Sequence, residues 1–244
     1  MQATNFWYKL NIHRSKIVFC LALFICNVAL GQKAPVKLNR IGSDAKKVNY
    51  GFFLGYHQNY YGIKYSDAFE GPDYDNVTSI VAKNNSGFNL GFMLNLRLDD
   101  QLTVRFVPVK IGLYQQMVQY NMTDGTVDEQ LIESTRIEPG IFVKYRSIRR
   151  DNLRMYVIAG VSASMRSGKA EDLGGVDKLE IRKGNLKAEI GFGFENYFEF
   201  FKLEPEIRYS RGLTNVLNPS NNFYSNGIGQ ITTHNFSIYF HFTD

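Results

Sequence analysis

The stretch of sequence that decides the fold runs from Leu186 to Ser210 and reads LKAEIGFGFENYFEFFKLEPEIRYS. On both sides of its centre, large apolar residues alternate with glycine or charged residues. A period of two residues places successive side chains on opposite faces of a β-strand. The stretch therefore predicts two strands, each with one apolar and one polar face, joined by a short turn.

The same alternation recurs from Val48 to the C-terminus. Segments with this pattern lie at 50–57, 88–98, 102–120, 136–146, 153–164, 186–195, 203–209 and 236–242. In the third segment Val107, Val109 and Ile111 interrupt the alternation, which indicates a β-bulge. The sequence thus predicts eight strands.

The connections between these segments alternate between short and long. Short ones lie at 99–101, 149–152 and 198–201, and long ones rich in Asn, Asp, Ser and Gly lie at 65–86, 121–134, 167–183 and 214–229. Short turns at one end and long loops at the other are typical of outer-membrane barrels. We therefore predict an all-β fold over residues 48–244, an eight-stranded antiparallel up-and-down transmembrane β-barrel of the outer-membrane type.

Alternation by itself leaves open which face meets water. A soluble barrel such as a lipocalin turns its apolar face inward around a ligand, whereas a membrane barrel turns that face toward lipid. Long apolar faces and aromatic residues near the strand ends favour the membrane. The last strand adds Phe236, Ile238, Phe240 and Phe242, an ending that resembles the C-terminal signal recognised by outer-membrane assembly machinery.

The first 31 residues have the layout of a cleaved secretory signal peptide. A basic stretch ending at Lys16 precedes an apolar run over 17–30, and small residues favour cleavage between Gly31 and Gln32. A single membrane anchor is the alternative, but the apolar run is shorter than the roughly 20 residues that a spanning helix needs. Residues 32–47 are polar and predict an N-terminal segment before the barrel. The expected location is the cell outer membrane.

Both cysteines, Cys20 and Cys26, lie inside the predicted signal peptide. A lipid attachment at Cys26 is conceivable, but Ile25 stands where a small residue is expected. Without cysteine in the mature chain, disulfides, zinc–thiolate sites and cysteine nucleophiles are excluded.

The positive charge of the chain gives little support for a nucleic-acid partner. The 244 residues carry 28 Lys and Arg against 23 Asp and Glu, but residues 1–31 hold three of the basic residues and no acid. The rest therefore has 25 basic and 23 acidic side chains, a net charge of +2. Nucleic-acid binding usually shows a clustered basic face.

If the apolar face meets lipid, many charged side chains face the barrel interior. The predicted interior charge network comprises Arg97, Arg105, Arg136, Glu138, Lys144, Arg146, Glu189, Glu195, Lys202, Glu204, Glu206 and Arg208, and Arg154 and Lys187 face the same way. An eight-stranded barrel is only wide enough for side chains to fill it. Because an unpaired buried charge costs several kcal/mol, we expect a salt-bridged, plugged cylinder, with an ion or proton path as the alternative.

No catalytic, cofactor-binding or metal site emerges from the sequence. Glu204 and Glu206 lie about 7 Å apart by strand geometry, a spacing compatible with glycoside hydrolysis, but the flanking basic residues favour a salt-bridge ladder. His241 and Ser237 share a strand face, which is compatible with the active site of a hydrolase that modifies lipid A. It lacks a matching acid and a GxSxG context, and we expect a protein that is not an enzyme.

Several motifs resemble the PorT family of Bacteroidota. They are GFFLG at 51–55, GFNLGF at 87–92 followed by LNLRL, RFVP at 105–108, EPEIRYSxGLTN at 204–215 and NNFYSNGI at 221–228. The resemblance spans about 48–242, nearly the whole mature chain.

The resemblance implies an outer-membrane β-barrel required for the type IX secretion system and, in gliding species, for motility. The implied role is an assembly or accessory component, since eight strands are too few to pass a folded cargo. Implied partners are outer-membrane lipid and other type IX secretion proteins, with no nucleic acid, cofactor or small-molecule substrate. The alternative is a general OmpA-like structural or adhesive barrel. The loops at 66–86 and 214–229, which carry exposed aromatic residues, are the predicted contact sites.

Overall fold

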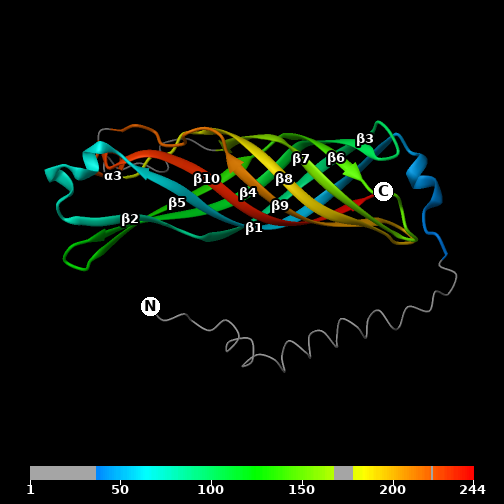
Figure 1. Ribbon diagram of the computed structural model, residues 1–244, viewed down its shortest axis with the longest axis horizontal. Helices are drawn as coiled ribbons and strands as arrows, with labels where there is room; N and C mark the ends of the chain where they lie inside the picture. The colour runs from blue at the N-terminus through cyan, green and yellow to red at the C-terminus, as the bar shows by residue number, and fades with distance from the viewer. Residues whose placement is uncertain (1–36, 168–177, 221) are drawn as a thin grey trace, which may run out of the picture. The chain divides into compact units, whose positions relative to one another are not determined.

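The computed structural model describes residues 37–167, 178–220 and 222–244. These residues form one antiparallel sheet of ten strands, with short helices in the connections (Figure 1). The elements are η1 (Ile41–Ala45), β1 (Val48–Tyr65), η2 (Asp67–Glu70), η3 (Pro72–Tyr74), β2 (Val77–Lys83), β3 (Asn85–Arg97), β4 (Leu102–Met122), β5 (Val127–Ile137), β6 (Gly140–Arg146), β7 (Leu153–Ser167), β8 (Gly184–Tyr197), β9 (Lys202–Gly212), α3 (Phe223–Asn226) and β10 (Ile228–Thr243). No helix within the described ranges is long and apolar enough to cross a membrane. The predicted signal peptide and its cleavage site at Gly31 and Gln32 lie outside them.

The sheet closes on itself into a ring of eight strand positions. β1 pairs with β10, and the other neighbours follow chain order around the ring. Two positions hold a strand that is broken in two. β2 continues β3 along β4, and β5 and β6 lie end to end between β4 and β7, interrupted at Pro139, which has no N–H to donate. The predicted eight-stranded up-and-down barrel is therefore confirmed.

Side chains alternate between the barrel interior and the outer surface. On β4, Arg105 is 0% exposed whereas the next residue, Phe106, is 45% exposed. Phe92 and Ile190 on other strands are more than 60% exposed. A continuous apolar outer surface of this kind is stable against lipid and unfavourable in water. The lipocalin alternative, which needs the apolar face inside, is wrong.

A β-bulge in β4 confirms the expectation for the third segment. Phe92 of β3 pairs with Val109 and Leu94 pairs with Phe106, so β4 carries one extra residue at this point, next to Pro108. The extra residue reverses which residues face inward, because the side-chain period of a strand is two. Lys110 consequently faces the interior.

Two of the predicted long loops contain strand. Residues 121–134 contain the end of β4, a turn at 123–126 and most of β5, and residues 65–86 contain β2 with two 3-10 helices. In the turn Gly125 has a φ of 84°, a conformation that glycine adopts without strain. The sequence did not predict these strands because neither β2 nor the first part of β5 alternates regularly between apolar and polar residues.

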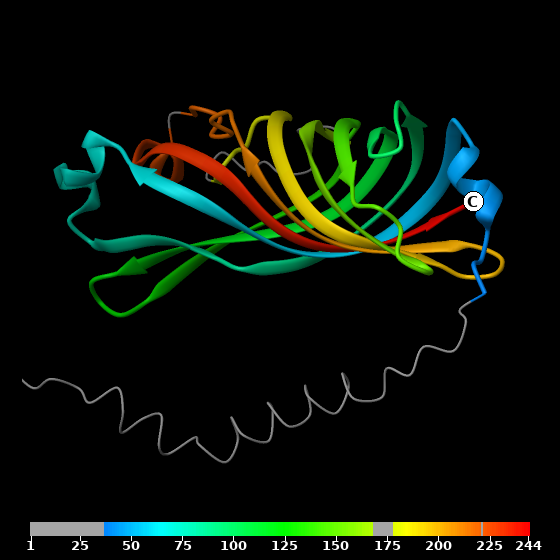
Figure 2. The same cartoon turned by 45° about the vertical axis from the view of Figure 1, so that its right-hand side comes forward.

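At this long-loop end the ring divides into two leaves (Figure 2). The first leaf comprises residues 60–65 of β1 and 228–233 of β10, and the second comprises β2, residues 115–122 of β4 and residues 127–134 of β5. The ladder between β1 and β3 ends at Asn59 and Asn85, and in the described chain no ladder joins β1 to β2. Among the residues that the structure describes, β5 pairs with β7 from Thr135 to Ile137.

Candidate functional site

A column of paired charges fills the barrel interior. Near the short-turn end, Lys144 donates to Glu195 at 2.5 Å and to Glu204 at 2.6 Å. Lys202 lies 3.0 Å from the same Glu204 carboxylate. All four side chains are at most 7% exposed, so each charge is neutralised by neighbours and not by water.

The middle of the column is centred on Glu206. Arg105 donates to Glu206 at 3.0 Å and to Glu204 at 2.5 Å, which links the middle to the short-turn end. Arg208 donates to Glu206 at 2.6 Å and to Glu189 at 3.2 Å. Charge-assisted bonds of this kind satisfy carboxylates that would otherwise be costly to bury.

The upper part of the column is centred on Glu138, at the break between β5 and β6. Its carboxylate lies 2.7 Å from Lys110 and also pairs with Lys187. Tyr114 and Ser164 donate their hydroxyl groups to it at 2.8 and 2.7 Å. Among the described residues, Glu138 is the only carboxylate within 4.0 Å of either lysine.

The structure places most of the predicted interior residues in this column, but three differ. Arg97 lies at the rim and pairs with Asp100 in the β3–β4 turn, so it does not join the network. Arg136 and Arg146 are buried, yet in the described chain no carboxylate lies within 4.0 Å of either. Arg136 donates to Ser134 at 3.2 Å, and Arg146 donates to the backbone carbonyl of Asp100 at 3.2 Å. The residues found in the column are Arg105, Glu138, Lys144, Glu189, Glu195, Lys202, Glu204, Glu206 and Arg208, with Lys187 and Lys110.

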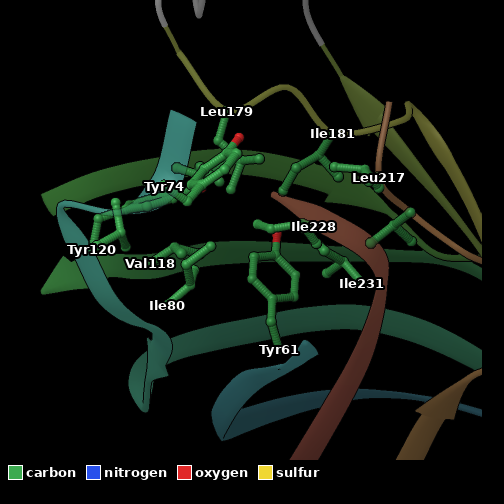
Figure 3. Close-up of a cluster of buried hydrophobic side chains, with 13 residues drawn as sticks. Tyr61, Tyr74, Ile80, Val118, Tyr120, Leu179, Ile181, Leu217, Ile228 and Ile231 are labelled. Atoms are coloured by element: carbon green, nitrogen blue, oxygen red, sulfur yellow. The ribbon is translucent and has the colours of Figure 1, made fainter. Parts of the chain in front are cut away.

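A cluster of buried apolar side chains, the apolar cap, closes the interior at the long-loop end (Figure 3). It comprises Tyr61, Tyr74, Val77, Ile80, Val118, Tyr120, Ile132, Leu179, Ile181, Val216, Leu217, Ile228 and Ile231. Both leaves and the loops of the β7–β8 and β9–β10 connections contribute to it. Full burial of an aliphatic side chain contributes about 1.5–3 kcal/mol, so the cap holds the two leaves together. In the sequence, two pairs of apolar residues in otherwise polar loops indicate this cap. They are Leu179 with Ile181, and Val216 with Leu217.

Residues 38–47 of the N-terminal segment lie against the opposite mouth of the barrel. Asp44 in η1 accepts from Arg149 at 3.0 Å, from Arg154 at 3.4 Å and from the Tyr197 hydroxyl at 2.9 Å. Arg154, which was expected to face the interior, thus pairs at the mouth. With paired charges filling its interior, the described barrel differs from a porin with its open aqueous lumen.

The same segment is tied to the C-terminal residue. Lys46 and Arg40 both form ion pairs with Asp244, directly after β10. Hydrogen bonds from Lys46 and Arg40 lower the pKa of Asp244 below its ordinary value of 3.8. This carboxylate is therefore ionised at neutral pH and pairs with both basic residues of the N-terminal segment.

The hydrolase geometry that the sequence left open is not assembled. The Ser237 hydroxyl donates to Asn235 at 2.5 Å, and His241 lies 3.3 Å from Glu206. A void of only about 10 Å³ lies among residues that include His241 and Glu138, which is room for about one water molecule. Among the described residues no cluster of three or more His, Cys, Asp or Glu is arranged to hold a metal ion.

Comparison with solved structures gives outer-membrane proteins of low sequence identity. OprG from Pseudomonas aeruginosa is 13% identical with a TM-score of 0.45, and the match covers 81% of this chain and 95% of OprG. Neisserial surface protein A is 11% identical with a TM-score of 0.39, covering 78% and 95%. Ail from Yersinia pestis, in complex with the heparin analogue sucrose octasulfate, is 12% identical with a TM-score of 0.37, covering 82% and 100%.

No curated protein sequence matches the chain. The family model described as "Outer membrane protein beta-barrel domain" matches residues 31–218, which is most of the chain. The match agrees with the closed antiparallel ring and its apolar outer surface. The chain therefore belongs to the outer membrane protein beta-barrel domain family.

Proposed function

We propose that this barrel is a non-enzymatic component required for protein export by the type IX secretion system, and for gliding motility where that system supports it. The resemblance of its motifs to the PorT family supports the assignment to this system. The observation that carries the accessory role is the closed interior, with the charge column between the apolar cap and the N-terminal segment. A barrel filled in this way acts through its surfaces and not as the conduit.

Four polar residues of the longest resembling motif, at 204–215, have contacts that shape the barrel or its β9–β10 loop. Glu204, Glu206 and Arg208 belong to the charge column. Asn215 accepts hydrogen bonds from the backbone N–H groups of Leu217 and Ile231, both at 3.0 Å. The motif thus contributes charges to the filled interior and an asparagine that binds the main chain of Leu217 and Ile231, which supports a scaffold role in secretion.

Deletion of the gene tests the proposal. Export of cargo proteins that carry a C-terminal export domain should stop, while the other outer-membrane proteins remain at normal levels. Normal cargo export combined with a weakened envelope would instead favour the general OmpA-like barrel, which the family membership fits equally well.

Complementation separates a scaffold role from an ion path through the interior. A Lys110→Met, Glu138→Leu, Lys187→Met triple variant removes the upper part of the column and leaves both mouths unchanged. If the variant folds and restores export, the interior charges serve structure. Loss of export by a correctly folded triple variant would contradict the scaffold role.

A further inference from the structure

A groove of about 450 Å³ lies in the barrel wall, across β3, β4 and β5. Its volume is within the range of ligand sites in proteins. Six exposed side chains line it, two from each strand: Ser86, Phe88, Leu113, Gln115, Glu133 and Thr135. We call it the interface groove.

The interface groove lies where the neighbour of β4 changes from one strand to the next. The ladder of β3 with β4 begins at Phe88 and Leu113, whereas the ladder of β2 with β4 ends at Lys83 and Met117. Between the two ladders, the Asn59 side chain of β1 donates to the carbonyl of residue 115 at 2.6 Å. A side-chain amide thus takes the place of a strand at this point of the wall.

The groove crosses the boundary of the hydrocarbon layer. At one end Phe88 and Leu113 are 64% and 54% exposed and continue the apolar outer surface. At the other end Glu133 is exposed, and a carboxylate facing hydrocarbon is costly. On the rim the Tyr56 hydroxyl lies 2.6 Å from the Ser86 hydroxyl, and tyrosine is typical of the boundary between lipid and water. The groove therefore has one end among acyl chains and the other among lipid head groups.

A negative charge marks the head-group end of the groove. Glu133 accepts a hydrogen bond from the Gln115 amide at 2.8 Å. A neutral amide orients the carboxylate and leaves its charge in place, so a cationic donor is attracted. The hydroxyl groups of Ser86 and Thr135 line the same groove and can donate to phosphate or ester oxygens. An amine-bearing phospholipid carries this combination of groups.

We propose that the interface groove binds a membrane lipid with a primary ammonium head group. The acyl chain contacts Phe88 and Leu113, and the ammonium group pairs with Glu133. Because the apolar end of the groove faces the hydrocarbon layer, a lipid reaches it and a water-soluble peptide does not. The proposal rests on the membership of an outer-membrane family and is independent of the role in type IX secretion.

Quenching of tryptophan fluorescence by brominated lipids tests the proposal. The single Trp of the chain is Trp7, in the predicted signal peptide, so Phe88→Trp places the one indole of the mature chain in the groove. Phe236→Trp is the matched control, an exposed aromatic position on β10 between Gln58 and Tyr209. The folded variants are placed in phosphatidylcholine vesicles that contain either brominated phosphatidylethanolamine or brominated phosphatidylcholine. The second lipid has methyl groups in place of the N–H donors.

The two lipids should differ at the groove and not at the control position. For Phe88→Trp we expect a preference of about two- to fivefold for phosphatidylethanolamine, the effect of one ion pair exposed to water. For Phe236→Trp we expect none. In the Phe88→Trp background, Glu133→Gln should abolish the preference. Glu129→Gln, which changes an acid on the same strand that does not line the groove, should retain it.

Four results would each overturn the proposal. They are equal quenching of Phe88→Trp by the two lipids, an equal preference at Phe88→Trp and Phe236→Trp, a preference that survives Glu133→Gln, and the absence of quenching of Phe88→Trp by either lipid. The last result would show that lipid does not enter the groove.

Discussion

Replacement of Glu138 by Gln should cause one of the largest losses of stability that a single substitution can produce in this barrel. Lys110 and Lys187 both pair with this carboxylate, and within the described residues neither has another acid within 4.0 Å. The substitution is close to isosteric, so packing changes little. It leaves two buried ammonium groups without a counter-charge.

The expected loss of unfolding free energy can be taken from other buried ion pairs that have lost one partner. Removal of one partner costs about 3–5 kcal/mol, because the remaining charge is left desolvated and unpaired. A loss of about 4 kcal/mol corresponds to a roughly thousandfold change in the folding equilibrium. The triple variant Lys110→Met, Glu138→Leu, Lys187→Met removes all three charges together. It should lie near the wild type, since apolar replacement of a buried ion network is often neutral or stabilising.

Urea unfolding in lipid vesicles, followed by the shift of the folded band on unheated gels, measures both variants. Equal slopes of the unfolding free energy against urea would show that the midpoints compare stability alone. A Glu138→Gln variant within about 1 kcal/mol of the wild type, or a triple variant as unstable as the single one, would refute the reasoning.

Three further predictions concern other parts of the barrel. Because the pKa of Asp244 is lowered, its contribution to docking of the N-terminal segment is complete above the ordinary carboxyl pKa and is lost as the pH falls through the lowered pKa. Pepsin cleavage of the segment should therefore rise in this acid range. The Asp244→Asn variant should show no such pH dependence. Phe92→Arg on the lipid face should destabilise the barrel by up to about 2–4 kcal/mol in vesicle unfolding, whereas Gln115→Lys beyond that face should cost less than about 1 kcal/mol. Tyr65→Phe should speed hydrogen exchange at the Ile80 amide, as measured by NMR, because the Tyr65 hydroxyl accepts from this N–H at 3.2 Å; unchanged exchange would show that the phenol does not protect it.

The strands that cross the membrane were predictable because one simple pattern governs them. Lipid outside and a filled interior force strict alternation, as in Leu186 to Glu195, where the sequence alone separates the two faces. The same alternation indicated Glu204, Glu206 and Arg208 as neighbours on the inward face. Their actual partners depend on which strands lie opposite, and the sequence does not contain that information directly.

The misassigned residues each mark a place where that pattern fails physically. Simple alternation does not predict Lys110 in the interior, because the extra residue beside Pro108 reverses the pattern after it. It predicts Arg97 inside because the register is correct, but the strand ends there and the side chain pairs with Asp100 at the rim. It predicts a loop in place of most of β5, because apolar and polar residues do not alternate regularly over 127–134.

The pairing of β1 with β10 is the last step in closing the barrel during assembly. The ladder runs from Gly51 with Thr243 to Tyr65 with Ile228, so two strands far apart in the sequence close the ring. Such long-range pairings form slowly. Until β10 has reached β1, every intermediate carries two open strand edges that need shielding.

Docking of the N-terminal segment depends on closure of the barrel. Arg40 and Lys46 find Asp244 beside them only after β10 has joined β1, and the Asp244 N–H donates to the Tyr50 carbonyl at 3.3 Å in the same place. Docking of the segment therefore follows closure of the ring. Resistance of this segment to protease would distinguish a completed barrel from one still being inserted.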